Sequence, residues 1–219
     1  MWTDARGGVE VRFFGRGAKV ADRGAELATL APDGVGCAWA KQVHSAAVLA
    51  ATAPGPAGEG DALVTREAGL VLSVVSVDCV PIMLAAGRWV AAVHAGWRGI
   101  VAGIVAATAS RLAEVGAAAP TTWTAWLGPA IGGCCYKVGP EVAERVAAAS
   151  TPDAVLAWPG KAKPHLDLAR AVATQLTVAG VGDLRPLVSC THCDRERLWS
   201  YRRDGTAAGR NLALIWKTT

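Results

Sequence analysis

The stretch from Leu70 to Gly99 decides the fold, and it reads LVLSVVSVDCVPIMLAAGRWVAAVHAGWRG. Three runs within it, 71–77, 81–86 and 89–94, are dense in Val, Ile and other apolar residues, which is typical of buried strands. The short Gly87-Arg88 step between the last two runs predicts a hairpin. This stretch therefore predicts the strands at the centre of a sheet.

Outside this stretch, short strand-like runs alternate with longer helical ones. Segment 99–115 is rich in Ala and is followed by Gly116, where a helix commonly stops, so we expect a buried helix there. The pattern predicts an α/β fold with mixed β-sheets sandwiched with helices, in a single domain over residues 1–219. Further strands are expected at 9–14, 39–44, 122–127, 184–189 and 211–216, further helices at 141–149 and 167–178, and surface loops at 51–59 and 150–163.

Charge and composition exclude several classes of function. Lys and Arg number 22 against 18 Asp and Glu, but they are scattered, whereas nucleic-acid binders carry a basic patch or run. A small anionic ligand fits this charge better. The first residues lack the apolar stretch of a signal peptide, and Asp78 and Pro81 interrupt the longest apolar tract. We therefore expect a cytoplasmic protein that does not bind membranes.

The chain contains six cysteines, which we expect to be reduced thiols or metal ligands, because the cytosol keeps thiols reduced. Cys190 and Cys193 have the spacing of a zinc knuckle, but no second pair follows them. Adjacent cysteines are poorly placed to chelate one metal, so we interpret Cys134 and Cys135 as packed thiols.

Polar residues follow the apolar strands in segments 41–44, 77–81 and 94–99. Such strand ends meet at a shared rim, where sites on mixed sheets are commonly built. His44, Cys79 and His94 would form a three-ligand zinc set with an open fourth position, the arrangement of a catalytic zinc. Each residue alone is more often a packed core or rim side chain, so spacing leaves both interpretations open.

Charged residues near these segments are candidates for binding a substrate. Arg98 lies where a helix should begin, and its planar fork suits phosphate, although pairing with a carboxylate is an equal alternative. Lys41 and Asp78 adjoin apolar strands and would be costly to bury without partners. Arg202 and Arg203 either hold an anionic or ribosyl group or anchor the C-terminal segment.

Taken together, these segments resemble the YfiH-like family of purine nucleoside phosphorylases, formerly labelled multicopper polyphenol oxidases or laccase-domain proteins. The resemblance extends over most of the chain. The motifs that carry it are Lys41-Gln42-Val43-His44, Gly60-Asp61-Ala62-Leu63-Val64-Thr65, Asp78-Cys79-Val80-Pro81, His94-Ala95-Gly96-Trp97-Arg98-Gly99, Gly128-Pro129-Ala130-Ile131-Gly132, and Ser200-Tyr201-Arg202-Arg203-Asp204-Gly205 with Gly209-Arg210.

The resemblance implies that His44, Cys79 and His94 hold zinc, with copper as the alternative metal. It also implies phosphorolysis of adenosine, inosine, guanosine and methylthioadenosine, together with deamination of adenosine. A purine nucleoside and phosphate would be the partners, and no obligate protein partner is evident. In this interpretation Cys79, His94, Asp78 and Arg98 are catalytic, with Asp78 moving protons, and Lys41, Arg202 and Arg203 bind substrate.

Two positions depart from the family pattern. Lys137 stands where the family usually has an acidic residue after the Cys-Tyr pair, a charge reversal that would alter substrate preference. The run Thr191-His192-Cys193-Asp194 leaves open a second, weaker metal contact at His192.

Three other functions stay open from the sequence. The first is a Cys-His hydrolase or deamidase with Cys79 as the nucleophile and His94 as its base. The second is a metal-stabilised binding module involved in editing peptidoglycan precursors. Copper-dependent phenol oxidation is the least favoured, because the chain has only four histidines and two methionines, Met1 and Met83.

Overall fold

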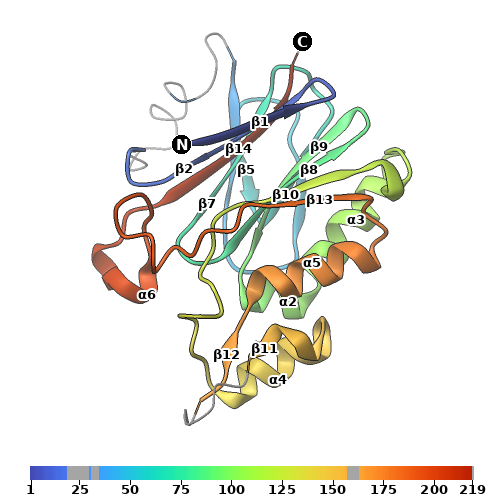
Figure 1. Ribbon diagram of the computed structural model, residues 1–219. Helices are drawn as coiled ribbons and strands as arrows, with labels where there is room; N and C mark the ends of the chain where they lie inside the picture. Colours follow the sequence, from blue (N-terminus) through green and yellow to red (C-terminus); the bar gives the residue numbers. More distant parts are fainter. Residues whose placement is uncertain (19–29, 31–34, 157–162, 219) are drawn as a thin grey trace.

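The computed structural model of the chain describes residues 1–18, 30, 35–156 and 163–218, and it contains two six-stranded mixed sheets (Figure 1). The first has the strand order β1 (Trp2–Arg6), β2 (Val9–Phe14), β14 (Asn211–Lys217), β7 (Val71–Ser76), β3 (Cys37–Lys41) and β5 (Gly55–Glu59). The second has the order β13 (Asp183–Pro186), β10 (Thr124–Leu127), β8 (Val80–Ala86), β9 (Trp89–Ala95), β6 (Ala62–Thr65) and β4 (Val48–Ala50). The predicted mixed-sheet α/β class is thereby confirmed.

Helices cover the second sheet on the face turned away from the first (Figure 1). The helices that pack there are α2 (Trp97–Ala102), α3 (Ile104–Glu114) and α5 (Leu168–Val178). Beyond them lie α4 (Pro140–Ala149) and a small ladder of β11 (Val155–Leu156) and β12 (His165–Leu166), and α6 (Tyr201–Asp204) precedes β14. Of the helices in the described ranges, none combines the length and the apolar character needed to cross a bilayer.

The second sheet is buried on both of its faces. Leu63, Met83 and Trp126 are fully buried against the first sheet, whereas their strand neighbours Val64 and Ile82 pack under the helices. This explains why the central strands β8 and β9 are apolar along almost their whole length, because alternate side chains of a strand point to opposite faces. The β8–β9 hairpin with its turn at Gly87 is as predicted.

Some predicted boundaries were wrong. The helix expected over 99–115 is broken at Gly103, whose φ of 82° ends α2 and begins α3. Segment 51–59 was expected to be a loop, but its second half forms β5 on the edge of the first sheet. The loop expected at 150–163 falls partly outside the described residues.

None of the six cysteines forms a disulfide, in line with the expectation of reduced thiols or metal ligands.

Leu72 on β7 is fully buried between the two sheets, so truncating it tests the packing of the sandwich. We expect Leu72→Ala to lower the free energy of unfolding by about 2–5 kcal/mol in urea denaturation, because it leaves a cavity in a core that cannot fully collapse. Val188→Ala is the control, since this side chain is 94% exposed and its truncation should cost less than about 0.5 kcal/mol. Equal stability of the two variants would contradict the described packing.

Candidate active site

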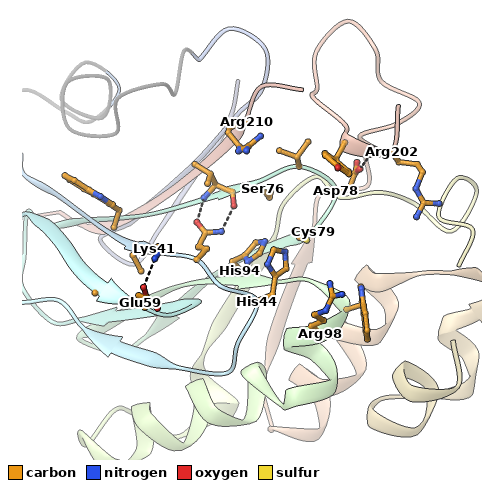
Figure 2. A pocket seen from close by; sticks show the side chains of 18 of the residues that line it. Lys41, His44, Glu59, Ser76, Asp78, Cys79, His94, Arg98, Arg202 and Arg210 are labelled. Atoms are coloured by element: carbon orange, nitrogen blue, oxygen red, sulfur yellow. Dashed lines mark hydrogen bonds and ion pairs between the residues drawn. The ribbon is translucent and has the colours of Figure 1, made fainter. Parts of the chain in front are cut away.

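Three side chains from distant segments meet at one end of the two sheets. His44 follows β3, Cys79 lies in the turn between β7 and β8, and His94 is near the end of β9. One donor atom from each lies within 4.8 Å of those of the other two, and the imidazole rings meet edge to face at 5.0 Å (Figure 2). The structure thus brings together the three residues that were predicted from the sequence to be metal ligands.

The backbone around this cluster has an unusual conformation. His44 and Asp78 have φ values of 60° and 89°, and among the described residues they are the only non-glycine positions with positive φ. Such conformations cost on the order of 1–3 kcal/mol each and are typical of functional sites. Gly96 also has no room for a side chain, because a Cβ there would lie 2.9 Å from the Cys79 sulfur and 3.0 Å from a His44 ring carbon. The local backbone is therefore shaped around the cluster.

Asp61, which is 1% exposed, holds the cluster in place. Its carboxylate accepts hydrogen bonds from the backbone N–H groups of Val43, His44 and Ser45 at 3.2, 3.0 and 2.6 Å. It also accepts one from the Ser45 hydroxyl at 2.9 Å and contacts His94 Nδ1 at 2.9 Å. With Nδ1 engaged in this way, His94 presents Nε2 to the cluster.

Asp61 is not among the site residues predicted from the sequence, although it lies in the Gly60–Thr65 motif. The available signal was an aspartate directly before the buried strand β6, where an unpartnered carboxylate would be costly. Burial alone would raise the pKa of Asp61, but its hydrogen bonds with His94 and Ser45 hold the pKa far below the usual value. Asp61 is therefore a carboxylate in the folded protein.

Hydrogen bonding also sets the charge of the cluster. Burial tends to raise the pKa of Cys79, but its contacts with His44 and His94 outweigh this effect and lower the pKa to about 7. Burial tends to lower the pKa of His94, but the Asp61 carboxylate and Cys79 raise it to about 9. Cys79 is thus readily ionised, as a thiolate ligand or a nucleophile must be.

The donor set fits a zinc ion with an open coordination position. Two imidazoles and a thiolate supply three ligands, the number typical of catalytic zinc. The carboxylate on His94 Nδ1 is the usual outer partner of a zinc-bound histidine, since it fixes the orientation of the ring. The residues present could therefore hold such an ion.

The cluster lies in a pocket of about 960 Å³ that residues of both sheets and of the C-terminal segment enclose (Figure 2). Three of the lining residues, Arg98, Arg202 and Arg210, are arginines. No carboxylate in the described part of the chain forms an ion pair with any of them. Arg202 donates to the Lys137 carbonyl at 2.6 Å, and Arg210 donates to the carbonyls of Ala208 and Gly209. No carboxylate offsets their positive charge, which therefore favours an anionic ligand. Aromatic rings also line this space, namely those of Trp39, Trp97, Tyr136 and Tyr201.

Two other residues selected from the sequence also line the pocket. Lys41 is largely exposed there and is paired with Glu59 at 2.6 Å. Asp78 accepts hydrogen bonds from the Thr191 hydroxyl at 2.6 Å and from the Arg202 backbone N–H at 2.7 Å. Both oxygens of Asp78 are therefore engaged, which favours a role in positioning the C-terminal segment.

Arg203 is not among the residues that line the pocket. Its guanidinium donates to the carbonyls of Thr191, His192 and Leu198 and forms an ion pair with Asp204 at 2.7 Å. This geometry corresponds to the anchoring alternative considered from the sequence. The side chain of His192 belongs to neither of the two candidate metal-ligand groups in the described residues.

Sequence reasoning missed three residues that shape the pocket. The amide of Gln42 both donates to and accepts from the backbone of Val75, at 2.7 and 2.9 Å, and so attaches the His44 loop to β7. Tyr136 and Arg210 line the pocket directly. Each lay in or beside a recognised motif, but their proximity depends on the folded chain.

Comparisons with known proteins agree with this fold and pocket. The family model described as "Multi-copper polyphenol oxidoreductase laccase" matches residues 16–218. "Purine nucleoside phosphorylase SCO2081" of Streptomyces coelicolor is 40% identical over 91% of this chain and 83% of its own, and "Purine nucleoside phosphorylase YfiH" of Escherichia coli is 36% identical over 81% and 72%. The crystal structure of Neisseria meningitidis protein NMB0706 superposes with a TM-score of 0.81 at 28% identity, covering 98% of this chain and 96% of that one.

Fold and pocket together define a class: mixed-sheet α/β proteins with a His-Cys-His cluster in an arginine-lined cavity. The chain belongs to the YfiH-like purine nucleoside phosphorylase family, as the resemblance of its motifs predicted.

Replacing Asp61 with Asn tests how far this carboxylate supports the cluster. The amide keeps the shape but places an N–H group against backbone donors and removes the negative partner of His94, so we expect zinc affinity to fall by about 10- to 100-fold. Competition with a chromophoric chelator measures the affinity, and circular dichroism checks the fold. Glu59→Gln is the matched control, since this carboxylate is exposed and pairs only with Lys41 in the described structure. Unchanged affinity in Asp61→Asn would refute the assigned role.

Proposed function

We propose that this chain is a zinc-dependent purine nucleoside phosphorylase with adenosine deaminase activity, carried by one catalytic domain over residues 1–219. It would convert adenosine, inosine, guanosine or methylthioadenosine and phosphate into the free base and the ribose 1-phosphate. The observation that carries this proposal is the pocket, where three arginines without a carboxylate partner in the described residues surround the His-Cys-His cluster. The names of the curated relatives supply the substrate class.

Phosphorolysis requires a phosphate oxygen to attack the anomeric carbon of ribose while the bond to the base breaks. Two negative charges must therefore be accommodated, the charge of phosphate and the charge that develops on the base as it takes the electrons of the broken C–N bond. Arg98, Arg202 and Arg210 are suited to the first task, because guanidinium groups bind phosphate in a bidentate manner. The Tyr136 hydroxyl is suited to the second, because burial raises its pKa to about 12 and it remains a hydrogen-bond donor at neutral pH.

The purine ring would bind among the aromatic side chains that line the same pocket. Arg98 lies over the Trp97 ring at 4.5 Å and Arg202 over the Tyr136 ring at 4.9 Å. These contacts hold both guanidiniums against rigid rings, so less freedom is lost when an anion binds.

Zinc held by three side chains supplies an activated water near neutral pH, which is the chemistry that deamination of adenosine requires. Copper is the alternative occupant of the same donor set. A blue-copper site would want a weak axial ligand such as Met, and Met83 is instead fully buried between the two sheets. With only four histidines in the chain, a multicopper cluster also lacks ligands.

One observation favours a second function. The lowered pKa of Cys79 and the raised pKa of His94 describe a thiolate beside an imidazolium, which is the resting state of a Cys-His nucleophile. In that alternative the protein is a hydrolase or deamidase that works without metal.

Incubation of the purified protein with adenosine and phosphate tests the proposal. We expect adenine, ribose 1-phosphate and inosine by chromatography, with all three lost in Cys79→Ala and after removal of metal by a chelator, and restored by added zinc. The exposed Val188→Ala should retain every product. Activity that survives complete metal removal but not Cys79→Ala would favour the Cys-His hydrolase, and no product under any condition would reject the phosphorylase.

Arg98→Ala tests the assignment of the phosphate site. Loss of a charge-assisted hydrogen bond of about 1.5–3 kcal/mol should raise KM for phosphate by about 10- to 100-fold and change KM for the nucleoside far less. Steady-state kinetics with each substrate varied in turn provide the measurement. Arg88→Ala, in the exposed β8–β9 turn, is the matched control. An increase confined to the nucleoside KM would place phosphate elsewhere.

A further inference from the structure

Four cysteines form a second cluster, separate from the His-Cys-His group. One sulfur from each lies within 4.8 Å of every other, and none is bonded to another. Two of the side chains are exposed and two are half-buried, so the group lies at the surface of the protein rather than in its core. Its members are Cys134, Cys135, Cys190 and Cys193.

The topology of the second sheet brings these residues together. Strands β10 and β13 are parallel neighbours, so the segments that leave their C-terminal ends run side by side. That pairing continues past the strands as a parallel bridge between Ala130 and Cys190. Each segment then turns, at Gly132 and at Cys190, and the two turns bring one pair of thiols toward the other.

The spacing of the sulfurs matches that of ligands around one small ion. Four thiolates at about 2.3 Å from a tetrahedral zinc have sulfur atoms about 3.8 Å apart. The sulfur of Cys193 lies 3.8 Å from that of Cys134 and 3.4 Å from that of Cys135. A single tetrahedral ion could therefore be bound with small movements of the side chains.

The Gly128–Tyr136 loop is also shaped around these sulfurs. A Cβ at position 132 would lie 3.1 Å from the Cys134 sulfur and 3.4 Å from the Cys190 sulfur, so the backbone packs tightly against both sulfurs. The Gly132 N–H donates a hydrogen bond to the Cys190 sulfur at 3.2 Å. An amide directed at sulfur stabilises its thiolate form, which is the form that binds metals.

We propose that Cys134, Cys135, Cys190 and Cys193 bind one zinc ion as a structural tetrathiolate site. Four protein ligands complete the tetrahedron, so this ion has no open position for substrate and differs in kind from the His-Cys-His site. The inference does not depend on the proposed catalytic activity.

The ion would hold two walls of the pocket together. Tyr136, which lines the pocket, directly follows Cys135 in the chain. Thr191 directly follows Cys190 and donates to Asp78 at 2.6 Å. A metal that joins the two turns therefore fixes the Tyr136 ring and the Asp78 turn relative to each other.

Metal content tests this inference directly, without reference to activity. Protein purified in reducing buffer, saturated with zinc and washed should contain one zinc fewer per chain in Cys79→Ala than in wild type, and one fewer in Cys190→Ser with Cys193→Ser. Combining all three changes should remove both ions. Cys37→Ser is the control, because this cysteine belongs to neither cluster and should leave the zinc content unchanged.

Cobalt substitution in Cys79→Ala keeps the test valid if the variant with Cys190→Ser and Cys193→Ser fails to fold. This variant retains all four cysteines of the surface cluster, and its bound cobalt should show the intense thiolate charge-transfer absorption of a tetrathiolate site. Absence of any bound zinc or cobalt in Cys79→Ala would overturn the proposal. So would undiminished zinc in the double Cys→Ser variant, iron in place of zinc, or a Cys135–Cys193 disulfide in protein freshly purified under reducing conditions.

Discussion

The buried carboxylate of Asp61 is the constraint on which the rest of the site depends. It accepts hydrogen bonds from the backbone N–H groups of three consecutive residues, 43–45, and so stabilises the left-handed conformation of His44. The same group contacts His94 at the end of β9 and determines which ring nitrogen faces the cluster. A charge with almost no exposure is stable only with such partners, so Asp61 and the loop require each other.

The two-sheet architecture explains why this arrangement lies at the base of a pocket. Strands β3 and β7 belong to the first sheet and β9 to the second, and the segments that follow them meet at one end of the sandwich. The interior of that sandwich is filled by apolar side chains, so polar groups can gather only where the strands end. Arg98, Arg202 and Arg210 reach the same place from other segments, and their charges offset the carboxylates and the ionised thiol there.

Much of this could be predicted from the sequence, because the strongest local signals belong to strands buried on both faces. The runs at β7, β8 and β9 were located from composition alone, and the polar residues at their ends pointed to the cluster. The contacts across the chain could not be predicted. Arg202 and Arg203 look alike in sequence, and both donate to backbone carbonyls. Only Arg203 forms an ion pair with Asp204, whereas Arg202 lines the pocket. Such differences depend on the partners that the fold provides.

The four surface cysteines likewise show that contacts between distant segments cannot be predicted from sequence spacing. No second pair of cysteines follows Cys190 and Cys193 at zinc-knuckle spacing, and adjacent residues such as Cys134 and Cys135 indicate packed thiols rather than ligands of one metal. The second pair lies upstream, and the parallel pairing of β10 with β13 brings it into place. Parallel strands carry their C-terminal extensions to the same edge, so residues about 60 positions apart become neighbours through sheet topology rather than through spacing. For this reason, a ligand set in a mixed sheet is better sought among strand ends that share an edge than among neighbours in the sequence.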